Sequence, residues 1–148
     1  MDFLDYTAKS PASYRIRMRD PEEVTTIVCH QMGVGVWRED NPMFAKTRAH
    51  FVAQQSGRVI KNHDPLWRLR YGSGVLNHCC ITLECAGNYE TSRGVWWKPE
   101  KMGRDRLAEH PKQVASVREL VAQLCEDYPS ITTITGHRAI SKGKSGCP

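Results

Sequence analysis

Two histidines and a cysteine are placed where they could bind one zinc ion. His137 and Cys147 lie ten positions apart in a segment rich in Gly, Ser and Lys, directly after an apolar β-type run at Ile131–Thr135. A second β-type run, Val24–Cys29, is followed at once by His30. Three protein ligands leave the fourth position of a tetrahedral zinc ion open for water, which is typical of a catalytic site and not of a structural one. The spacing therefore indicates a zinc hydrolase.

Each histidine also has an explanation without a metal. His30 taken alone is more simply a buried histidine at the end of a strand, and His137 taken alone is a loop histidine. Cys147 in the same loop, together with the order of the two strands, favours the ligand hypothesis for the set. Two neutral imidazoles and one thiolate would leave the zinc ion with a net positive charge, which preserves its Lewis acidity.

The elements that must position these residues follow from hydrophobic patterning. Residues 24–29 are nearly continuous in β-branched side chains, which favours a central strand, and 79–85 and 131–135 have the composition of further strands. The other segments are interpreted as an irregular arm at 1–23, a short helix at 42–48, a β-hairpin at 49–60, an extended piece at 66–71 and a long loop at 88–110.

One long helix is expected near the C-terminus. Between Pro111 and Tyr128, apolar side chains recur at intervals of three and four residues, which predicts an amphipathic helix that ends before Pro129. Strands that alternate with a packing helix predict an α/β fold with a central mixed β-sheet flanked by helices. We expect a single domain over residues 1–148, with residues 1–23 as its N-terminal arm.

Composition argues against several classes of protein. No stretch approaches the ~20 apolar residues of a membrane span. The N-terminus has no cationic leader followed by an apolar run, so no signal peptide is expected. The net charge is +5, but the basic residues are scattered, and no basic stripe interleaved with aromatic residues suggests nucleic acid as a partner. An anionic polymer such as the bacterial cell wall remains compatible with this charge.

The six cysteines fall into two groups. Cys147 lies in a polar loop beside a proline, whereas the other five lie within apolar runs, where a free cysteine behaves as a small hydrophobic residue. Buried, reduced thiols are therefore preferred to disulfides for Cys29, Cys79, Cys80, Cys85 and Cys125.

Four segments in this order resemble the zinc-dependent N-acetylmuramoyl-L-alanine amidase family, which includes phage lysozyme-type amidases and peptidoglycan recognition proteins. The resemblance covers residues 24–148. The segments are Ile27-Val-Cys-His30, the hairpin pieces Ala49-His-Phe-Val and Ser56-Gly-Arg-Val59, the strand Ile81-Thr-Leu-Glu84-Cys-Ala-Gly87, and Gly136-His137-Arg through Cys147-Pro148.

The resemblance implies a role for each matched residue. His30, His137 and Cys147 would bind Zn²⁺, and Glu84 would be the general base, although it could also lie on the exposed polar face of a half-buried strand. Lys144 would stabilise the oxyanion, with Lys142 and Ser145 as competitors for this role. Substrate contacts are expected at Asn77 and at Trp96 and Trp97, unless the two tryptophans only anchor their loop on the sheet. His50 is interpreted as structural, and His63, His78 and His110 as surface or loop histidines.

The chain departs from the family pattern at three places. Ala49 stands where the phage branch has a tyrosine, Ser145 stands where the family has a lysine, and the chain ends at Pro148 where relatives continue, so a domain trimmed at its C-terminus stays an open interpretation.

The resemblance implies a monomeric hydrolase that cleaves the amide bond between N-acetylmuramic acid and L-alanine in peptidoglycan or muropeptides. It would be made in the cytoplasm, and it would act either as a bacteriolytic endolysin on the cell wall after release or on cytoplasmic muropeptides. Two alternatives remain open: a non-catalytic peptidoglycan-binding module of the same fold, and a protein with structural zinc that binds nucleic acid. The last would need a fourth ligand, and Cys29 is expected on the opposite side of its strand from His30.

Overall fold

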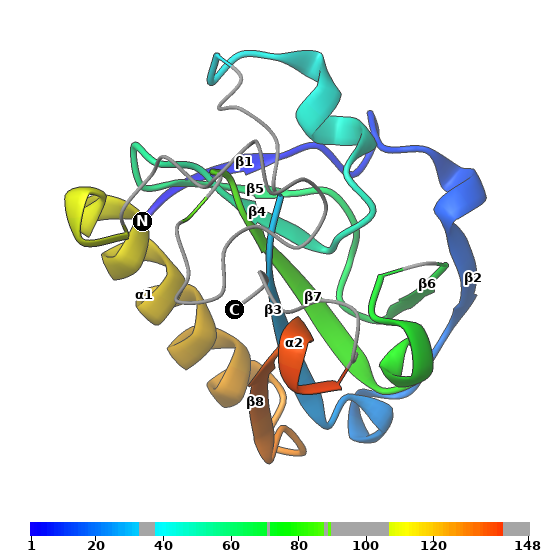
Figure 1. Cartoon of the computed structure of the whole chain (residues 1–148). Helices are drawn as coiled ribbons and strands as arrows, with labels where there is room; N and C mark the ends of the chain where they lie inside the picture. Colours follow the sequence, from blue (N-terminus) through cyan, green and yellow to red (C-terminus); the bar gives the residue numbers. More distant parts are fainter. Residues whose placement is uncertain (33–37, 71, 88, 90–106, 141–148) are drawn as a thin grey trace.

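A six-stranded mixed sheet forms the centre of the molecule (Figure 1). The computed structural model describes residues 1–32, 38–70, 72–87, 89 and 107–140. The strands lie in the order β1-β5-β4-β7-β3-β8, and neighbours are parallel except for the antiparallel pair β4 and β5. Their bounds are β1 Asp2–Asp5, β3 Thr26–Gln31, β4 Phe51–Ala53, β5 Arg58–Lys61, β7 Cys80–Cys85 and β8 Thr133–Gly136.

One face of this sheet packs against the long helix α1 (Pro111–Asp127). Leu120 and Leu124 of the helix are almost completely buried against alternate residues of the strands. Since side chains alternate across a strand, the same apolar residues that fill this core fix which residues face away from it. The strand residues of this cluster are Ile27, Phe51, Ala53, Val59, Ile81 and Leu83, and Cys29 packs against them.

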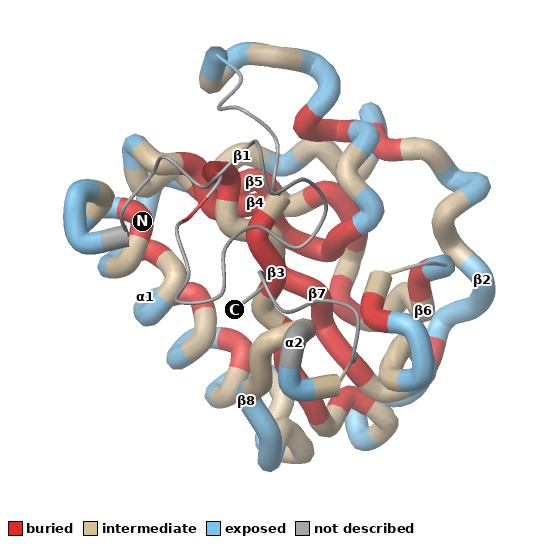
Figure 2. The backbone as a smooth tube through the Cα atoms, in the orientation of Figure 1, coloured by how far each residue is buried: buried red, intermediate tan, exposed pale blue. Residues whose placement is uncertain are grey.

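The opposite face of the sheet has a smaller apolar cluster. Val52 and Ile60 pack there with Phe44, which belongs to the 3₁₀ helix η3 (Pro42–Lys46). Asn41 caps η3, because its side-chain oxygen accepts a hydrogen bond from the Met43 N–H group. Further along, this face becomes polar, with Thr82 and Glu84 of β7. Figure 2 shows that β3 and β7 run through the most buried part of the molecule.

The second sheet has two strands, β2 (Arg15–Met18) and β6 (Trp67–Leu69). The buried guanidinium of Arg19, which follows β2, attaches this sheet to the main one. It donates hydrogen bonds of 2.7 Å to the carbonyl oxygens of Pro65 and Cys80, so the β6 segment and β7 are joined through one side chain.

Most of the predicted elements are confirmed. The mixed α/β sheet, the central position of Val24–Cys29, the helix from Pro111 and the hairpin with glycine in its turn are all present. Gly57 of that hairpin has φ +94°, and an added Cβ would lie 3.0 Å from the Lys112 carbonyl oxygen, so the turn needs glycine there. Residues 88–110 lie largely outside the described part of the chain.

The prediction of an irregular arm over residues 1–23 is wrong. This segment contributes β1, which pairs in parallel with β5, and β2, which pairs with β6. Both strands are largely exposed and β1 is at an edge, so neither shows the apolar alternation that marks a strand buried on one face.

The cysteine prediction is largely confirmed. Cys29, Cys79, Cys80 and Cys125 are free thiols that are buried or half-buried. Cys29 packs on the α1 side, away from His30, as alternation along the strand requires. Within the described residues, no helix combines the length and the apolar character that a membrane crossing requires.

Truncating the helix side of the core should destabilise the fold strongly. Leu124→Ala removes a side chain that is 3 % exposed, and we expect the free energy of unfolding to fall by about 2–5 kcal/mol. Glu126→Ala, on the exposed face of the same helix, should change it by less than about 0.5 kcal/mol. Urea denaturation followed by circular dichroism measures both, and equal effects would contradict the assignment of the buried face.

Candidate active site

Two histidine rings lie against each other at the C-terminal ends of neighbouring parallel strands. His30 is on β3, and His137 begins the short helix α2 (His137–Ile140) directly after β8. Their ring centroids are 4.1 Å apart and the ring planes are inclined by 52°. His30 is almost completely buried and His137 half-buried. The structure therefore brings together two of the three predicted zinc ligands, from segments more than one hundred residues apart in the sequence.

Glu84 lies beside this pair. It is the register partner of His30 on β7, and its Oε1 atom is 4.0 Å from His30 Nδ1. Its other oxygen, Oε2, is buried and makes no hydrogen bond to any described residue. Burial raises the pKa of Glu84 to about 7, because the charged form loses its hydration. A carboxylate with this environment can exchange a proton near neutral pH, and the alternative of an exposed polar strand face does not fit its burial.

Ser73 is a contact of His30 that sequence reasoning missed. Its Oγ atom is 3.1 Å from His30 Nε2, and the residue is 2 % exposed. Ser73 lies just before the 3₁₀ helix η4 (Gly74–Leu76), in a Gly-Ser-Gly segment between β6 and β7. No periodicity or motif in the sequence indicates that this loop folds back on His30.

Asn77 directly follows η4, and its side chain contacts the loop that holds Ser73. Its side-chain oxygen accepts a hydrogen bond of 2.5 Å from the Ser73 N–H group, so it supports the turn that carries Ser73. The predicted substrate contact of Asn77 stays a prediction.

Both ring nitrogens of His50 have hydrogen-bond partners. Its Nδ1 atom accepts a 3.0 Å hydrogen bond from the Thr82 N–H group, and its Nε2–H group donates to the Trp67 carbonyl oxygen at 2.8 Å. Burial lowers the pKa of His50 to about 3, so the ring is neutral at physiological pH. These contacts fit the structural role that was expected.

His63 lies in a loop, as one interpretation had it, but it is not a surface residue. It is 0 % exposed, and its Nδ1 atom accepts a hydrogen bond from Arg15 Nε at 3.3 Å. Burial, together with the nearby Arg15 charge, lowers the pKa of His63 to about 4. His63 is buried because β2 packs against this loop through Arg15, and the sequence did not predict that strand.

The remaining predicted site residues lie outside the described part of the chain. These are Cys147, Lys144, Trp96 and Trp97, together with Lys142 and Ser145. Among the described residues, no third His, Cys, Asp or Glu joins the histidine pair to complete a metal site. The pair itself has the chemistry that zinc requires, since neutral imidazoles are borderline-soft nitrogen donors.

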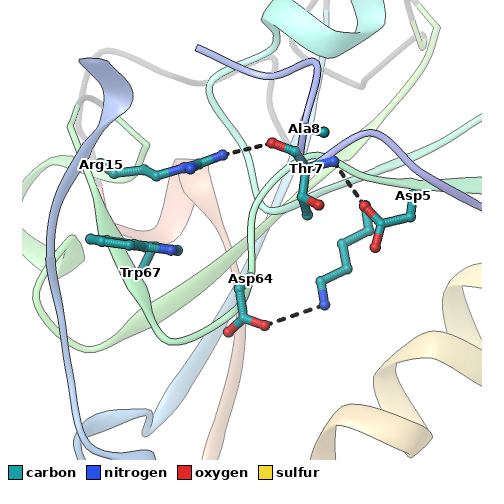
Figure 3. A pocket seen from close by; sticks show the side chains of 7 residues that line it. Asp5, Thr7, Ala8, Arg15, Asp64 and Trp67 are labelled. Carbon is teal, nitrogen blue, oxygen red and sulfur yellow. Dashed lines mark hydrogen bonds and ion pairs between the residues drawn. The ribbon is translucent and has the colours of Figure 1, made fainter. Parts of the chain in front are cut away.

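A cavity of about 390 Å³ lies elsewhere, between the end of β1, β2 and the start of β6 (Figure 3). His30, Glu84 and His137 do not line this cavity. Its charged groups are paired with their neighbours: Lys61 with Asp64 at 3.3 Å, and Arg15 with the Thr7 carbonyl oxygen at 2.7 Å. Figure 3 shows Arg15 over the ring of Trp67. The arrangement is a set of mutual contacts and does not indicate a catalytic centre.

A family model described as N-acetylmuramoyl-L-alanine amidase matches residues 20–148. None of the curated proteins matches the chain in sequence.

Solved structures with the same fold include two bacterial or phage lytic proteins and one animal protein. The Ph2119 endolysin from a bacteriophage of Thermus scotoductus has a TM-score of 0.68 at 19% identity, over 99% of this chain and 90% of that chain. The amidase LysC from Clostridium intestinale has a TM-score of 0.65 at 15% identity, over 100% and 89%. A mutant of Drosophila PGRP-LB in complex with tracheal cytotoxin has a TM-score of 0.65 at 13% identity, over 99% and 87%. At these identities the likeness shows the fold alone.

The neutral state of His50 should make stability depend on pH. The folded pKa of about 3 lies below the ordinary histidine pKa of 6.5, so the unfolded chain binds the extra proton between these values. Protons then favour unfolding: the contribution is complete above pH 6.5 and is lost as the pH falls toward 3. In His50→Gln, the increase of unfolding free energy with pH should be less steep than in the wild type, by about 1.4 kcal/mol per pH unit near pH 5.

The informative quantity is the difference in slope between the wild type and His50→Gln. The slope of either protein alone also contains the contribution of Glu84, whose raised pKa makes stability fall with rising pH in the same interval. Urea denaturation at pH 4.5, 5.0, 5.5 and 6.0 gives both slopes, and equal slopes would contradict the buried neutral state. Independently, the ring resonances of His50 in wild-type NMR spectra should show no titration above about pH 4.

Proposed function

Since the chain belongs to the N-acetylmuramoyl-L-alanine amidase family, we propose that it is a zinc-dependent hydrolase that cleaves the amide bond between N-acetylmuramic acid and L-alanine in peptidoglycan. The observation that supports this proposal most directly is the meeting of His30 and His137 beside the buried carboxylate of Glu84. Amide hydrolysis needs an activated water, a polarised carbonyl group and a proton for the leaving nitrogen, and this arrangement has groups for these tasks.

The two imidazoles are the described part of the proposed zinc site. His30 and His137 would each give one nitrogen, and the Cys147 thiolate would be the third ligand, as the family resemblance implies. When bound, the zinc ion supplies Lewis acidity that activates water and polarises a carbonyl group. Three ligands of this kind leave a position open, which a catalytic site needs.

Glu84 has the position of a general base. It is held on a central strand, its side chain is 19 % exposed, and one of its oxygens is without a hydrogen-bond partner among the described residues. A carboxylate in this state can accept the proton of the attacking water and return it to the leaving nitrogen of the L-alanine amide. The family resemblance implies the same role, because Glu84 would match the acidic general base of the bacterial branch of the family.

The substrate proposal draws on the fold relatives. The PGRP-LB mutant with this fold was solved with tracheal cytotoxin, which is a monomeric diaminopimelic acid-type peptidoglycan. Peptidoglycan recognition protein LE, which is also similar in fold, was solved with the same ligand. We infer that muropeptides bind over the His30 and His137 edge, with Asn77, Trp96 and Trp97 in contact with them and Lys144 near the oxyanion. Both a lysin that acts on the cell wall and an enzyme that acts on free muropeptides are consistent with this chemistry.

Loss of either histidine should abolish zinc binding. In His30→Ala and His137→Ala, zinc content after dialysis should fall from about one ion per chain to near zero, because two remaining ligands hold the ion weakly. His78→Ala removes an exposed histidine and is the matched control that should retain the ion. Cys147→Ser should also lose zinc, with Cys125→Ser as its control. Atomic emission spectroscopy on the folded proteins measures this, and full zinc content in a ligand variant would contradict the assignment.

Glu84→Gln should separate metal binding from turnover. The amide keeps the size of the side chain but cannot accept the proton of water, so zinc should remain while the rate falls about 10²- to 10⁴-fold. Release of the stem peptide from purified muropeptides, followed by mass spectrometry, gives the rate, with Glu126→Gln on the exposed face of α1 as a control at wild-type rate. A wild-type protein that binds muropeptide but releases no peptide would instead identify a recognition module.

A further inference from the structure

The two ring nitrogens of His30 face different surroundings. Nε2 is 3.1 Å from Ser73 Oγ, whereas Nδ1 is on the side of Glu84, with Oε1 at 4.0 Å. A neutral imidazole has one N–H group and one lone pair, and only the nitrogen with the lone pair can bind a cation. Which nitrogen keeps the proton therefore decides whether the lone pair of His30 is directed to Ser73 or to the side of Glu84.

Ser73 is held in place by contacts on both sides. Its N–H group donates to the Asn77 side-chain oxygen at 2.5 Å, which fixes the backbone of the loop. Its hydroxyl group also hydrogen-bonds to the Cys80 thiol, whose pKa burial raises to about 11, so that this thiol stays protonated. The Cys80 sulfur can accept the hydroxyl hydrogen of Ser73, and the oxygen lone pairs of Ser73 are then available to His30.

We propose that Ser73 is a positioning residue that accepts a hydrogen bond from His30 Nε2–H and thereby makes Nδ1 the metal-binding nitrogen of His30. This inference rests on the proposed zinc site. Ser73 itself is not one of the proposed zinc ligands. If Ser73 instead donated to Nε2, the proton of the ring would be on Nδ1, and the one lone pair of the ring would be engaged by Ser73 and not directed to a cation. A ligand histidine at this position is thus compatible with one tautomer only.

The location of Ser73 fits a positioning role. It is 2 % exposed and lies 43 residues from His30 in the chain, so the contact is made by tertiary packing and not by local backbone geometry. Partners of this kind fix the tautomer and the ring orientation of metal-binding histidines, and their loss typically weakens metal binding 10–100-fold.

The first experiment is the zinc affinity of Ser73→Ala. Zinc chloride is titrated into metal-free protein in competition with a chromophoric chelator, and we expect the dissociation constant to rise about 10- to 100-fold. Ser116→Ala is the matched control: Ser116 is also buried, its hydroxyl donates to the Gln113 carbonyl oxygen, and it is on α1, on the other side of the sheet. The control should bind zinc within about twofold of the wild type. A Ser73→Ala affinity within the same twofold range would overturn the proposal.

The second experiment observes the tautomer directly in the metal-free protein. With ¹⁵N-labelled histidine at pH 8, NMR distinguishes protonated from unprotonated ring nitrogens, and wild-type His30 should have its proton on Nε2. In Ser73→Ala the ring should populate both tautomers, while Ser116→Ala should match the wild type. A proton on Nδ1 in the wild type, or an unchanged tautomer in Ser73→Ala, would overturn the proposal.

The two measurements also separate this inference from the proposed function. A wild-type protein that binds no zinc would overturn the proposed hydrolase, and the metal-free NMR spectrum would still decide whether Ser73 sets the His30 tautomer. A wild type that binds zinc tightly with the proton on Nδ1 would leave the hydrolase intact and remove Ser73 from its site.

Discussion

The parallel pairing of β3 with β7 and with β8 is the constraint on which the site depends. Because these three strands run in the same direction, their C-terminal ends meet at one edge of the sheet. In the observed register His30 lies opposite Glu84, and Cys29 lies opposite Gly136, the residue before His137. A slip of one residue along β7 would turn Glu84 toward the α1 core. The hydrogen bonds that hold the sheet therefore also hold the three side chains together.

Buried polar groups in this molecule differ in how completely they are paired. Both ring nitrogens of His50 have partners, and its neutral ring stabilises the junction of β7 with the β6 segment. Glu84 is different, because a rise of its pKa to about 7 corresponds to about 3 kcal/mol against the ionised form. A fold that only needed a well-packed strand would gain from an apolar residue there. Packing does not explain why a carboxylate with an unpaired oxygen stands at this position, and such a group is the expected mark of a functional residue.

The sequence predicted the elements that have a regular apolar pattern and the site residues that occur in the family's order along the chain. β3, β7 and α1 were predicted because their apolar residues have the pattern of a buried strand or helix. His30, Glu84 and His137 were predicted because they lie in or directly after apolar strand-like runs, in the family's order. β1 and β2 were not predicted, because the side chains of exposed strands do not alternate between apolar and polar. Ser73 and His63 were missed or misplaced for a related reason: each is in a loop, and only packing against a distant segment buries it.

The alternation along β3 separates stability from chemistry. Ile27 and Cys29 pack toward α1, where the core gains its hydrophobic free energy, while His30 is on the opposite face with the polar groups of β7. Changing a side chain on the polar face therefore leaves the α1 core filled, and the sheet can persist whether or not the site can turn over a substrate. The fold therefore requires the register of the strands, whereas the proposed chemistry also requires the complete set of polar groups at this edge of the sheet.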